Sequence, residues 1–257
     1  MTRIAERVLA DERGLARAAG EQLVREVDRC VRRKRPCYLA MSGGANAERL
    51  YRHLAAHYRR DILWHLCTVF VLDDEIGPMD SGTAGLLQRT LFHEASGTAP
   101  TLHQAPPNAG GTEATAAAYE RLIRAVVPAG PAGIPAFDVI VLGLDDHCCP
   151  TLYSRAGSAS SDDERLVVSC PDTGNPSEPG RLGFALRLIN SAECVIILAS
   201  GAHQAAAYAR VRKDFAVSRA LAATPAGRIR PTGQAMWFID QTLSRATVDI
   251  AGAPGPS

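Results

Sequence analysis

Short runs of mostly apolar residues recur along the chain, and helical spacing of apolar residues follows several of them. The runs are residues 37–41, 66–72, 137–142, 194–198 and 235–239. Continuous rather than alternating apolar runs are typical of strands that are buried on both faces. Alternation of such strands with helices favours a mainly parallel sheet. We therefore expect an α/β protein whose sheet is flanked by helices on both faces.

The remaining segments complete this expectation. The spacing predicts helices over residues 3–33, 46–60 and 112–127, the last capped by Thr112, and another helix after a turn-rich stretch near residue 80. Shorter strands are expected at 166–169 and 181–186, and residues 97–111 are expected to form a loop. No linker or repeat divides the chain, so residues 1–250 are predicted to form a single domain, and residues 251–257 a disordered tail.

Charge and composition exclude several classes of function. The 257 residues include 28 Lys and Arg and 27 Asp and Glu, a formal net charge of +1, which argues against a nucleic-acid partner bound through a basic face. A small anionic ligand needs only one cationic pocket and stays possible. No run of 18 apolar residues and no signal-peptide pattern is present, so we expect a cytoplasmic protein that does not bind membranes.

The cysteines favour a reduced protein. There are seven, an odd number without CxxC spacing, and several lie inside apolar runs. We interpret them as small core residues rather than a disulfide framework. His147-Cys148-Cys149 lacks a second group at metal-ligand spacing, so no metal is predicted. A nucleophilic cysteine with His147 as its base is a minor alternative.

Polar residues follow four of the predicted strands. They are Ser42-Gly43-Gly44, Asp73-Asp74-Glu75, Asp145-Asp146-His147 and Ser200-Gly201. Because ligands of open parallel sheets bind beyond the carboxyl ends of the strands, these groups are the candidate site. No Walker A, GxGxxG or GxSxG motif accompanies them, which leaves kinase, dehydrogenase and α/β-hydrolase functions without support.

Each group has a chemical and a structural interpretation. The glycines of Ser42-Gly43-Gly44 could cradle an anion at a helix N-terminus or simply form a tight turn. Asp74 and Glu75 could be an acid/base pair, a helix cap or a solvated turn. His147 beside Asp145 suits a general base whose tautomer a carboxylate fixes, or is a structural or merely exposed loop histidine.

Six segments, taken together and in order over roughly residues 5–245, resemble the 6-phosphogluconolactonase family and, more distantly, the glucosamine-6-phosphate deaminases. The segments are Ser42-Gly43-Gly44-Ala45-Asn46-Ala47, Trp64 followed by Asp74-Glu75-Ile76-Gly77-Pro78, Asp80-Ser81-Gly82, Phe137 to His147 with Leu152-Tyr153, Arg181 to Ala192, and Pro231, Gly233, Trp237 and Asp240. The resemblance implies a Rossmann-like fold of the sugar-phosphate isomerase/deaminase type.

The resemblance also implies hydrolysis of a phosphorylated sugar δ-lactone without metal or organic cofactor. We expect a monomer or homodimer, and the sequence does not decide between them. His147 would activate the attacking water as a general base, and Asp145 would orient the His147 side chain. Ser42-Gly43-Gly44 would cradle the phosphate, with Arg181 adding charge. Asp74 and Glu75 would position hydroxyl groups or support the helix that carries them.

The chain departs from the family pattern at two cations. Ile76 stands where the family has an arginine, and Gln204 stands where it has a phosphate-binding lysine, although Arg187 or His203 could supply a charge instead. Two alternatives therefore stay open. One is an amino-sugar-phosphate isomerase or deaminase in which Asp74 moves a proton, and the other is a repurposed or non-catalytic member that binds another polyol.

Overall fold

A seven-stranded sheet, in which every pairing is parallel, forms the centre of the protein. The structure is a computed structural model that describes residues 2–75, 80–93, 99–107, 110–144, 164–170 and 180–252. In order across the sheet, the strands are β1 (Arg3–Leu9), β10 (Gln234–Asp240), β9 (Cys194–Ala199), β6 (Val139–Gly143), β2 (Cys37–Met41), β3 (Cys67–Val71) and β5 (Thr101–His103). This confirms the α/β fold with a mainly parallel sheet.

The five interior strands lie where the continuous apolar runs predicted them, whereas both edge strands were missed. The expected helix over residues 3–33 is wrong in its first part, since β1 occupies Arg3–Leu9 and helix α1 covers only Glu12–Arg32. Residues 3–9 are half exposed and pair with β10 on one side only. The helix begins after Asp11, whose carboxylate accepts a hydrogen bond from the Gly14 N–H at 2.7 Å.

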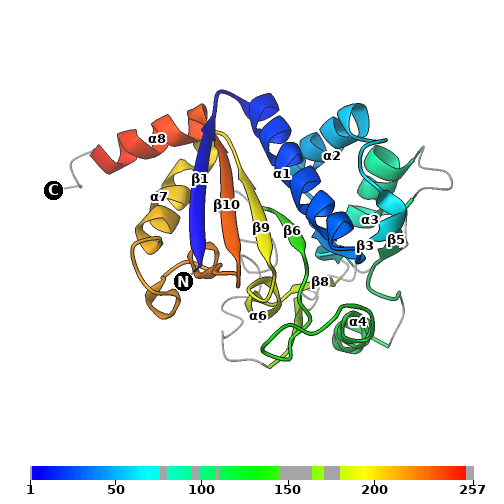
Figure 1. Ribbon diagram of the computed structural model, residues 1–257. Coiled ribbons are helices and arrows are strands. Elements are labelled where there is room, and N and C mark those ends of the chain that lie inside the picture. The colour runs from blue at the N-terminus through cyan, green and yellow to red at the C-terminus, as the bar shows by residue number, and fades with distance from the viewer. Residues whose placement is uncertain are drawn as a thin grey trace.

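Helices cover both faces of the sheet and divide the core into two clusters. One face packs against α1, α2 (Ala45–His57) and α3 (Gly82–Leu87). The other packs against α4 (Thr112–Val126), α6 (Leu186–Ile189), α7 (Ala205–Asp214) and α8 (Gln241–Gly252). Figure 1 shows α1 and α2 together beside the sheet, and α7 and α8 together next to β1.

Short helical segments lie in several of the connections. They are η1 (Trp64–Leu66), the π-helical η2 (Gln88–Phe92), η3 (Ala202–Gln204), η4 (Arg219–Leu221) and η5 (Ala226–Arg228). Every helix of the described segments is too short or too polar to span a bilayer.

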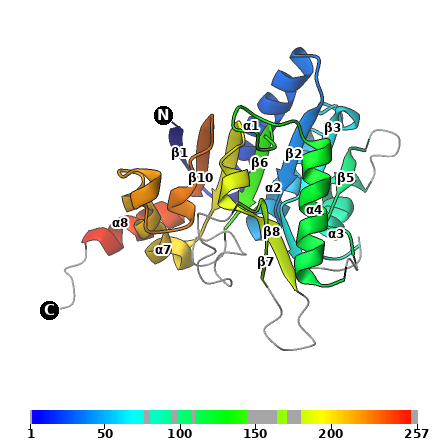
Figure 2. The same ribbon diagram turned by 90° about the horizontal axis from the view of Figure 1, so that it is seen from below.

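A second, antiparallel sheet extends the structure beyond the carboxyl end of β3. It has the order β4 (Asp73–Glu75), β8 (Arg181–Phe184) and β7 (Val167–Cys170), and α4 lies beside it (Figure 2). The sequence predicted β7 and β8 as strands, but Asp73-Asp74-Glu75 was expected to be only the polar end of a strand. Pairing with β8 makes it a strand of its own.

Smaller differences concern the helix ends and the loop before α4. Residues 101–103 form the edge strand β5 inside the expected loop. The N-cap of α4 is Gly111 rather than Thr112, which is the first helical residue. Helix α8 includes the first two residues of the expected tail, and residues 253–257 lie outside the described residues.

The strand order reverses direction between β2 and β6. From β2 the chain moves outward through β3 to β5, and from β6 it moves the other way through β9 to β10. Such a switch point leaves a crevice at the carboxyl ends of the two central strands, and ligands of open α/β sheets bind there. The topology therefore places Ser42-Gly43-Gly44, which follows β2, at the expected position for a ligand.

Candidate functional site at the carboxyl edge

Ser42 joins the two strands at the switch point. Its Oγ accepts a hydrogen bond from the Gly143 N–H at 2.7 Å, and its own N–H donates to the Val141 carbonyl at 3.1 Å. The buried Tyr51 hydroxyl donates to the Ser42 carbonyl at 2.7 Å, and Ser42 is 1% exposed. The Ser42 hydroxyl thus holds the exit of β6 against the exit of β2.

The two glycines after Ser42 serve different needs. A Cβ on Gly43 would lie 2.6 Å from Oγ1 of Thr83, so glycine permits the close approach of α3. Gly44 is the N-cap of α2 with φ of 97°, a conformation that favours glycine, and no side chain caps the helix. No described atom lies within 4 Å of a Cβ built there. The first turn of α2 thus has no side-chain cap among the described residues, and its N–H groups are the kind of donors that an anion site uses.

Asp74 supports the neighbouring helix α3. Its carboxylate accepts hydrogen bonds from the N–H groups of Thr83 at 2.9 Å, Ala84 at 3.3 Å and Glu75 at 2.9 Å. Burial raises the pKa of the Asp74 carboxyl, and these backbone donors oppose the shift. Of the two roles that the resemblance allowed for Asp74, the contacts match support of a helix.

Arg181 and Glu75 form an ion pair across β4 and β8. The guanidinium Nη1 lies 2.7 Å from Oε1 of Glu75, and the Arg181 side chain is 20% exposed. The two residues are also directly opposite each other in the strand register. Glu75 therefore neutralises much of the charge that Arg181 could offer to a substrate.

Gln204 occupies the position of the expected phosphate-binding cation, yet it acts as a cross-link. The Ser200 N–H donates to its Oε1 at 3.1 Å, and its Nε2 donates to the Leu144 carbonyl at 3.2 Å. Gln204 is 3% exposed. The amide thus holds the chain just beyond β6 against the end of β9, and His203 lies beside it in η3.

The described site residues gather at one edge, whereas others cannot be placed. Ser42, Gly43, Gly44, Asp74, Glu75 and Gln204 follow the carboxyl ends of β2, β3 and β9, and Arg181, the first residue of the antiparallel β8, lies opposite Glu75. Asp145, His147, Ile76, Cys148 and Cys149 lie outside the described residues. Arg187, a candidate replacement cation, lies on α6 and lines a cavity at the opposite edge.

A polar cluster at the start of α2 escaped the sequence analysis. The Ser200 hydroxyl lies 2.8 Å from Oδ1 of Asn46, and Arg49 contacts both Asn46 at 3.3 Å and Glu12 at 2.9 Å. Ser200 was predicted only as a strand end. The position of Asn46, two residues after Gly44, was the available signal, but its partner Ser200 follows β9, and Glu12, which contacts Ser200 and Arg49, begins α1.

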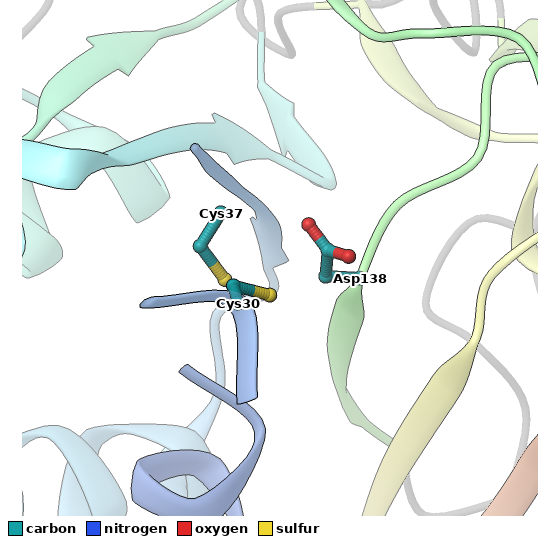
Figure 3. A group of neighbouring side chains, drawn as sticks. All are labelled: Cys30, Cys37 and Asp138. Atoms are coloured by element: carbon teal, nitrogen blue, oxygen red, sulfur yellow. The ribbon is translucent and has the colours of Figure 1, made fainter. Parts of the chain in front are cut away.

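A buried group of potential metal ligands lies at the opposite edge of the sheet. One ligand atom from each of Cys30, Cys37 and Asp138 lies within 4.8 Å of the others (Figure 3). The Asp138 carboxylate is already bound by Arg35 at 2.5 Å and by the Tyr38 N–H at 2.8 Å. Hydrogen bonding to neighbouring thiols and burial raise the pKa of Cys37, which disfavours the thiolate that a metal needs. We assign no metal to this group.

The cysteines in the described interior match the sequence interpretation. Cys30, Cys37, Cys67 and Cys194 are free and buried. They fill apolar space at the amino ends of the strands and in α1.

Known proteins resemble this chain over most of its length. The 6-phosphogluconolactonase of a Nostoc species is 28% identical over 236 residues, covering 91% of this chain and 94% of the relative. The 6-phosphogluconolactonase of Streptomyces coelicolor is 27% identical over 244 residues, covering 91% of both chains.

Solved structures share the fold at lower identity. The 6-phosphogluconolactonase from Trypanosoma brucei superimposes with a TM-score of 0.76 at 19% identity, over 95% of this chain and 99% of that one. A monomeric glucosamine-6-phosphate deaminase superimposes with a TM-score of 0.72 at 16% identity, over 95% and 100%. The family model described as glucosamine-6-phosphate isomerases/6-phosphogluconolactonase matches residues 10–237. The chain therefore belongs to the glucosamine-6-phosphate isomerase/6-phosphogluconolactonase family.

Proposed function

We propose that this protein hydrolyses a 6-phosphorylated sugar δ-lactone, as a 6-phosphogluconolactonase does. The relatives that cover nine-tenths of the chain carry that name. The observation that carries the proposal is the switch-point contact between Ser42 Oγ and the Gly143 N–H, 2.7 Å long. It joins Ser42, two residues before the N-cap of α2, to Gly143 at the end of β6. From Gly143 the chain continues to Asp145 and His147.

The phosphate is held mainly by backbone groups in this proposal. The uncapped first turn of α2 offers N–H donors and the positive end of the helix dipole. Arg49, one turn further along α2, and Arg181 are each paired with a carboxylate, Glu12 and Glu75 respectively. Their charge is therefore partly neutralised, and recognition depends more on geometry than on free cations.

His147 is the proposed general base. It stands three residues beyond Leu144, and covalent geometry limits three residues to about 11 Å of chain. Leu144 is itself held by Gln204 at 3.2 Å. In the reaction His147 accepts a proton from water while the water oxygen bonds to the lactone carbonyl carbon. The ring C–O bond then breaks and the departing ring oxygen takes the proton from His147, giving the open-chain acid.

The deaminase alternative receives less support from the geometry. It requires Asp74 to move a proton between carbons of the substrate. The Asp74 carboxylate instead accepts three backbone N–H groups and supports α3. These hydrogen bonds favour the ionised carboxylate and so weaken Asp74 as a base.

The test is a turnover assay with three substrates. The purified chain is incubated with 6-phosphoglucono-δ-lactone, unphosphorylated glucono-δ-lactone and glucosamine 6-phosphate, and acid release above the spontaneous rate is followed together with free ammonia. We expect acid release with the phosphorylated lactone, a much slower rate without the phosphate, and no ammonia. Ammonia release would establish the deaminase, and binding of 6-phosphogluconate without any turnover would establish a non-catalytic member.

A further inference from the structure

A cavity lined by four arginines opens at the amino edge of the sheet, opposite the proposed catalytic site. Arg187 comes from α6, Arg219 from η4, and Arg228 and Arg230 from the segment that leads into β10. Three chain segments form its walls, and each precedes a strand of the sheet, β6, β9 or β10. Its volume of about 650 Å³ lies within the range of small-molecule sites.

Three of the four arginines of this cavity have no acidic partner among the described residues, and the fourth, Arg230, interacts with Asp214. No Asp or Glu is among the described residues that line it. Arg187, Arg219 and Arg228 form no ion pair with any described residue. By contrast, the Arg181 guanidinium at the carboxyl edge lies 2.7 Å from the Glu75 carboxylate. In a chain whose net charge is only +1, this leaves a local excess of positive charge. Such a cavity attracts anions.

Two of the arginines are held in place before any ligand binds. The Nε of Arg228 donates to the Ala222 carbonyl at 2.9 Å, which leaves its terminal nitrogens without a described partner. Arg230 donates to the carbonyls of Ile229 and Asp214 at 3.1 and 2.8 Å and lies over the Phe215 ring. Burial lowers the pKa of the Arg230 guanidinium, with Asp214 opposing the shift, and the group remains a cation at neutral pH.

Asn190 fixes the backbone that carries these two arginines. Its Nδ2 donates to the Arg228 carbonyl at 3.0 Å, and its Oδ1 accepts from the Arg230 N–H. The side chain of Asn190 is 7% exposed. The arginine-bearing segment is therefore tied to the wall formed by α6, which reduces the entropy lost when a ligand binds.

We propose that this arginine cavity binds a small organic molecule that carries two or more phosphate groups, such as a nucleoside di- or triphosphate. Guanidinium groups recognise phosphate oxygens through paired hydrogen bonds, and four arginines line this cavity. A single phosphate would leave some of these cations unpaired, whereas a chain of phosphates engages more of them. The apolar side chains of Ile134 and Leu186 supply a surface for the organic part.

Binding to the full-length protein tests this proposal directly. Isothermal titration at about 0.1 M salt, where charge interactions are screened beyond roughly 10 Å, compares ATP, inorganic tripolyphosphate and adenosine. We expect ATP and tripolyphosphate to bind and adenosine not to bind. ATP binding more tightly than tripolyphosphate would show that the apolar wall contributes, and equal affinities would show that phosphate alone is recognised. Excess 6-phosphogluconate should not displace either ligand.

A double variant and a matched control locate the site. In Arg187→Ala/Arg219→Ala both side chains are exposed and have no hydrogen bond among the described residues, so the melting temperature should not change. Loss of two charge-assisted contacts should raise the dissociation constant roughly hundredfold or more. Arg245→Ala removes an exposed arginine from α8, outside the cavity, and should leave binding unchanged. Failure of both polyanions to bind, equal affinity of the double variant, or equal weakening by the control would overturn the proposal.

Discussion

The candidate site at the carboxyl edge and the arginine cavity at the amino edge use polar side chains in opposite ways. At the carboxyl edge, cations are paired with acids and polar side chains bind backbone, as Arg181 binds Glu75 and Ser42 binds Gly143. In the arginine cavity at the amino edge, Arg187 and Arg219 have no acidic partner in the described part of the chain. The site at the carboxyl edge therefore offers groups in fixed positions, whereas the arginine cavity offers positive charge that no acid neutralises at Arg187 and Arg219.

This difference indicates how each edge would recognise an anion. A site that must orient a reacting carbonyl benefits from fixed backbone donors, because their positions do not change during the reaction. A site that only binds a polyanion can rely on long cationic side chains. The loss of the two expected cations at Ile76 and Gln204 is therefore compatible with catalysis, provided that the first turn of α2 holds the phosphate.

The largest expected effect is on turnover at the carboxyl edge. His147→Ala should lower the rate of lactone hydrolysis by a hundredfold or more, the contribution typical of a general base. The same variant should bind tripolyphosphate as the wild type does. Steady-state kinetics and titration check the two halves. Loss of activity in Cys148→Ser, together with inactivation of the wild type by a thiol-alkylating reagent, would instead point to a cysteine nucleophile with His147 as its base.

The next effect concerns the support of α3 by Asp74. Gly82 has φ of 53°, and a Cβ there would lie 2.0 Å from Oδ1 of Asp74. Gly133 has φ of 70° but no described atom within 4 Å of its Cβ position. Gly133→Ala should cost only the conformational strain, about 1 kcal/mol. Gly82→Ala should cost roughly 1–3 kcal/mol more, because the carboxylate must leave buried N–H groups without an acceptor.

Urea unfolding of both glycine variants measures that difference. Equal losses of stability would show that Asp74 does not hold α3 in the way the contacts indicate. A larger loss for Gly82→Ala, accompanied by slower turnover, would link the support of α3 to the site.

Ser42→Ala tests the contact at the switch point. The substitution leaves the Gly143 N–H without its acceptor at a position where Ser42 is 1% exposed. We expect a loss of about 1–3 kcal/mol in unfolding free energy. Ser218→Ala is the control, since Ser218 is exposed and its side chain makes no capping bond. Identical stability of the two variants would contradict the assigned role of Ser42.

The smallest effect is a pH dependence of stability. Burial raises the pKa of folded Asp74 above its ordinary value of 3.8. The unfolded chain therefore loses this proton first as the pH rises, and folding stability falls from about pH 4 until the folded group ionises. Asp74→Asn replaces the carboxyl by an amide that does not titrate, so this contribution to the pH dependence is lost. Unfolding free energies of wild type and variant, measured from pH 4 to 7, should therefore converge or cross with rising pH, whereas a constant difference would mean that the pKa is not raised.

The sequence predicts the interior of the sheet better than its edges. The runs that became β2, β3, β6, β9 and β10 are apolar because both faces of these strands are covered. The edge strands β1 and β5 contain exposed and half-buried residues, and what makes them strands is pairing with β10 and β3. A local pattern cannot reveal a partner that is more than 200 residues away, as in β1 and β10.

The candidate site shows the same limit. The polar groups at the strand ends were found because parallel strands bring their ends together. Their individual partners were not found, because Asp74 meets Thr83 and Arg181 meets Glu75 only in the folded chain. Arg187 was considered as a substitute charge for the phosphate, but the fold places it with Arg219, Arg228 and Arg230 at the other edge.

The central claim is that the first turn of α2 holds the substrate phosphate. Ala45, the first residue of that helix, is exposed, so Ala45→Asp places a negative charge in the anion site while still suiting the helix dipole. Ala45→Asn has nearly the same shape without the charge. Titration of both variants with 6-phosphogluconate should show binding at least roughly tenfold weaker for the aspartate, equivalent to about 1.4 kcal/mol, with tripolyphosphate binding equal in both. Equal affinity of the two variants for 6-phosphogluconate would contradict the account.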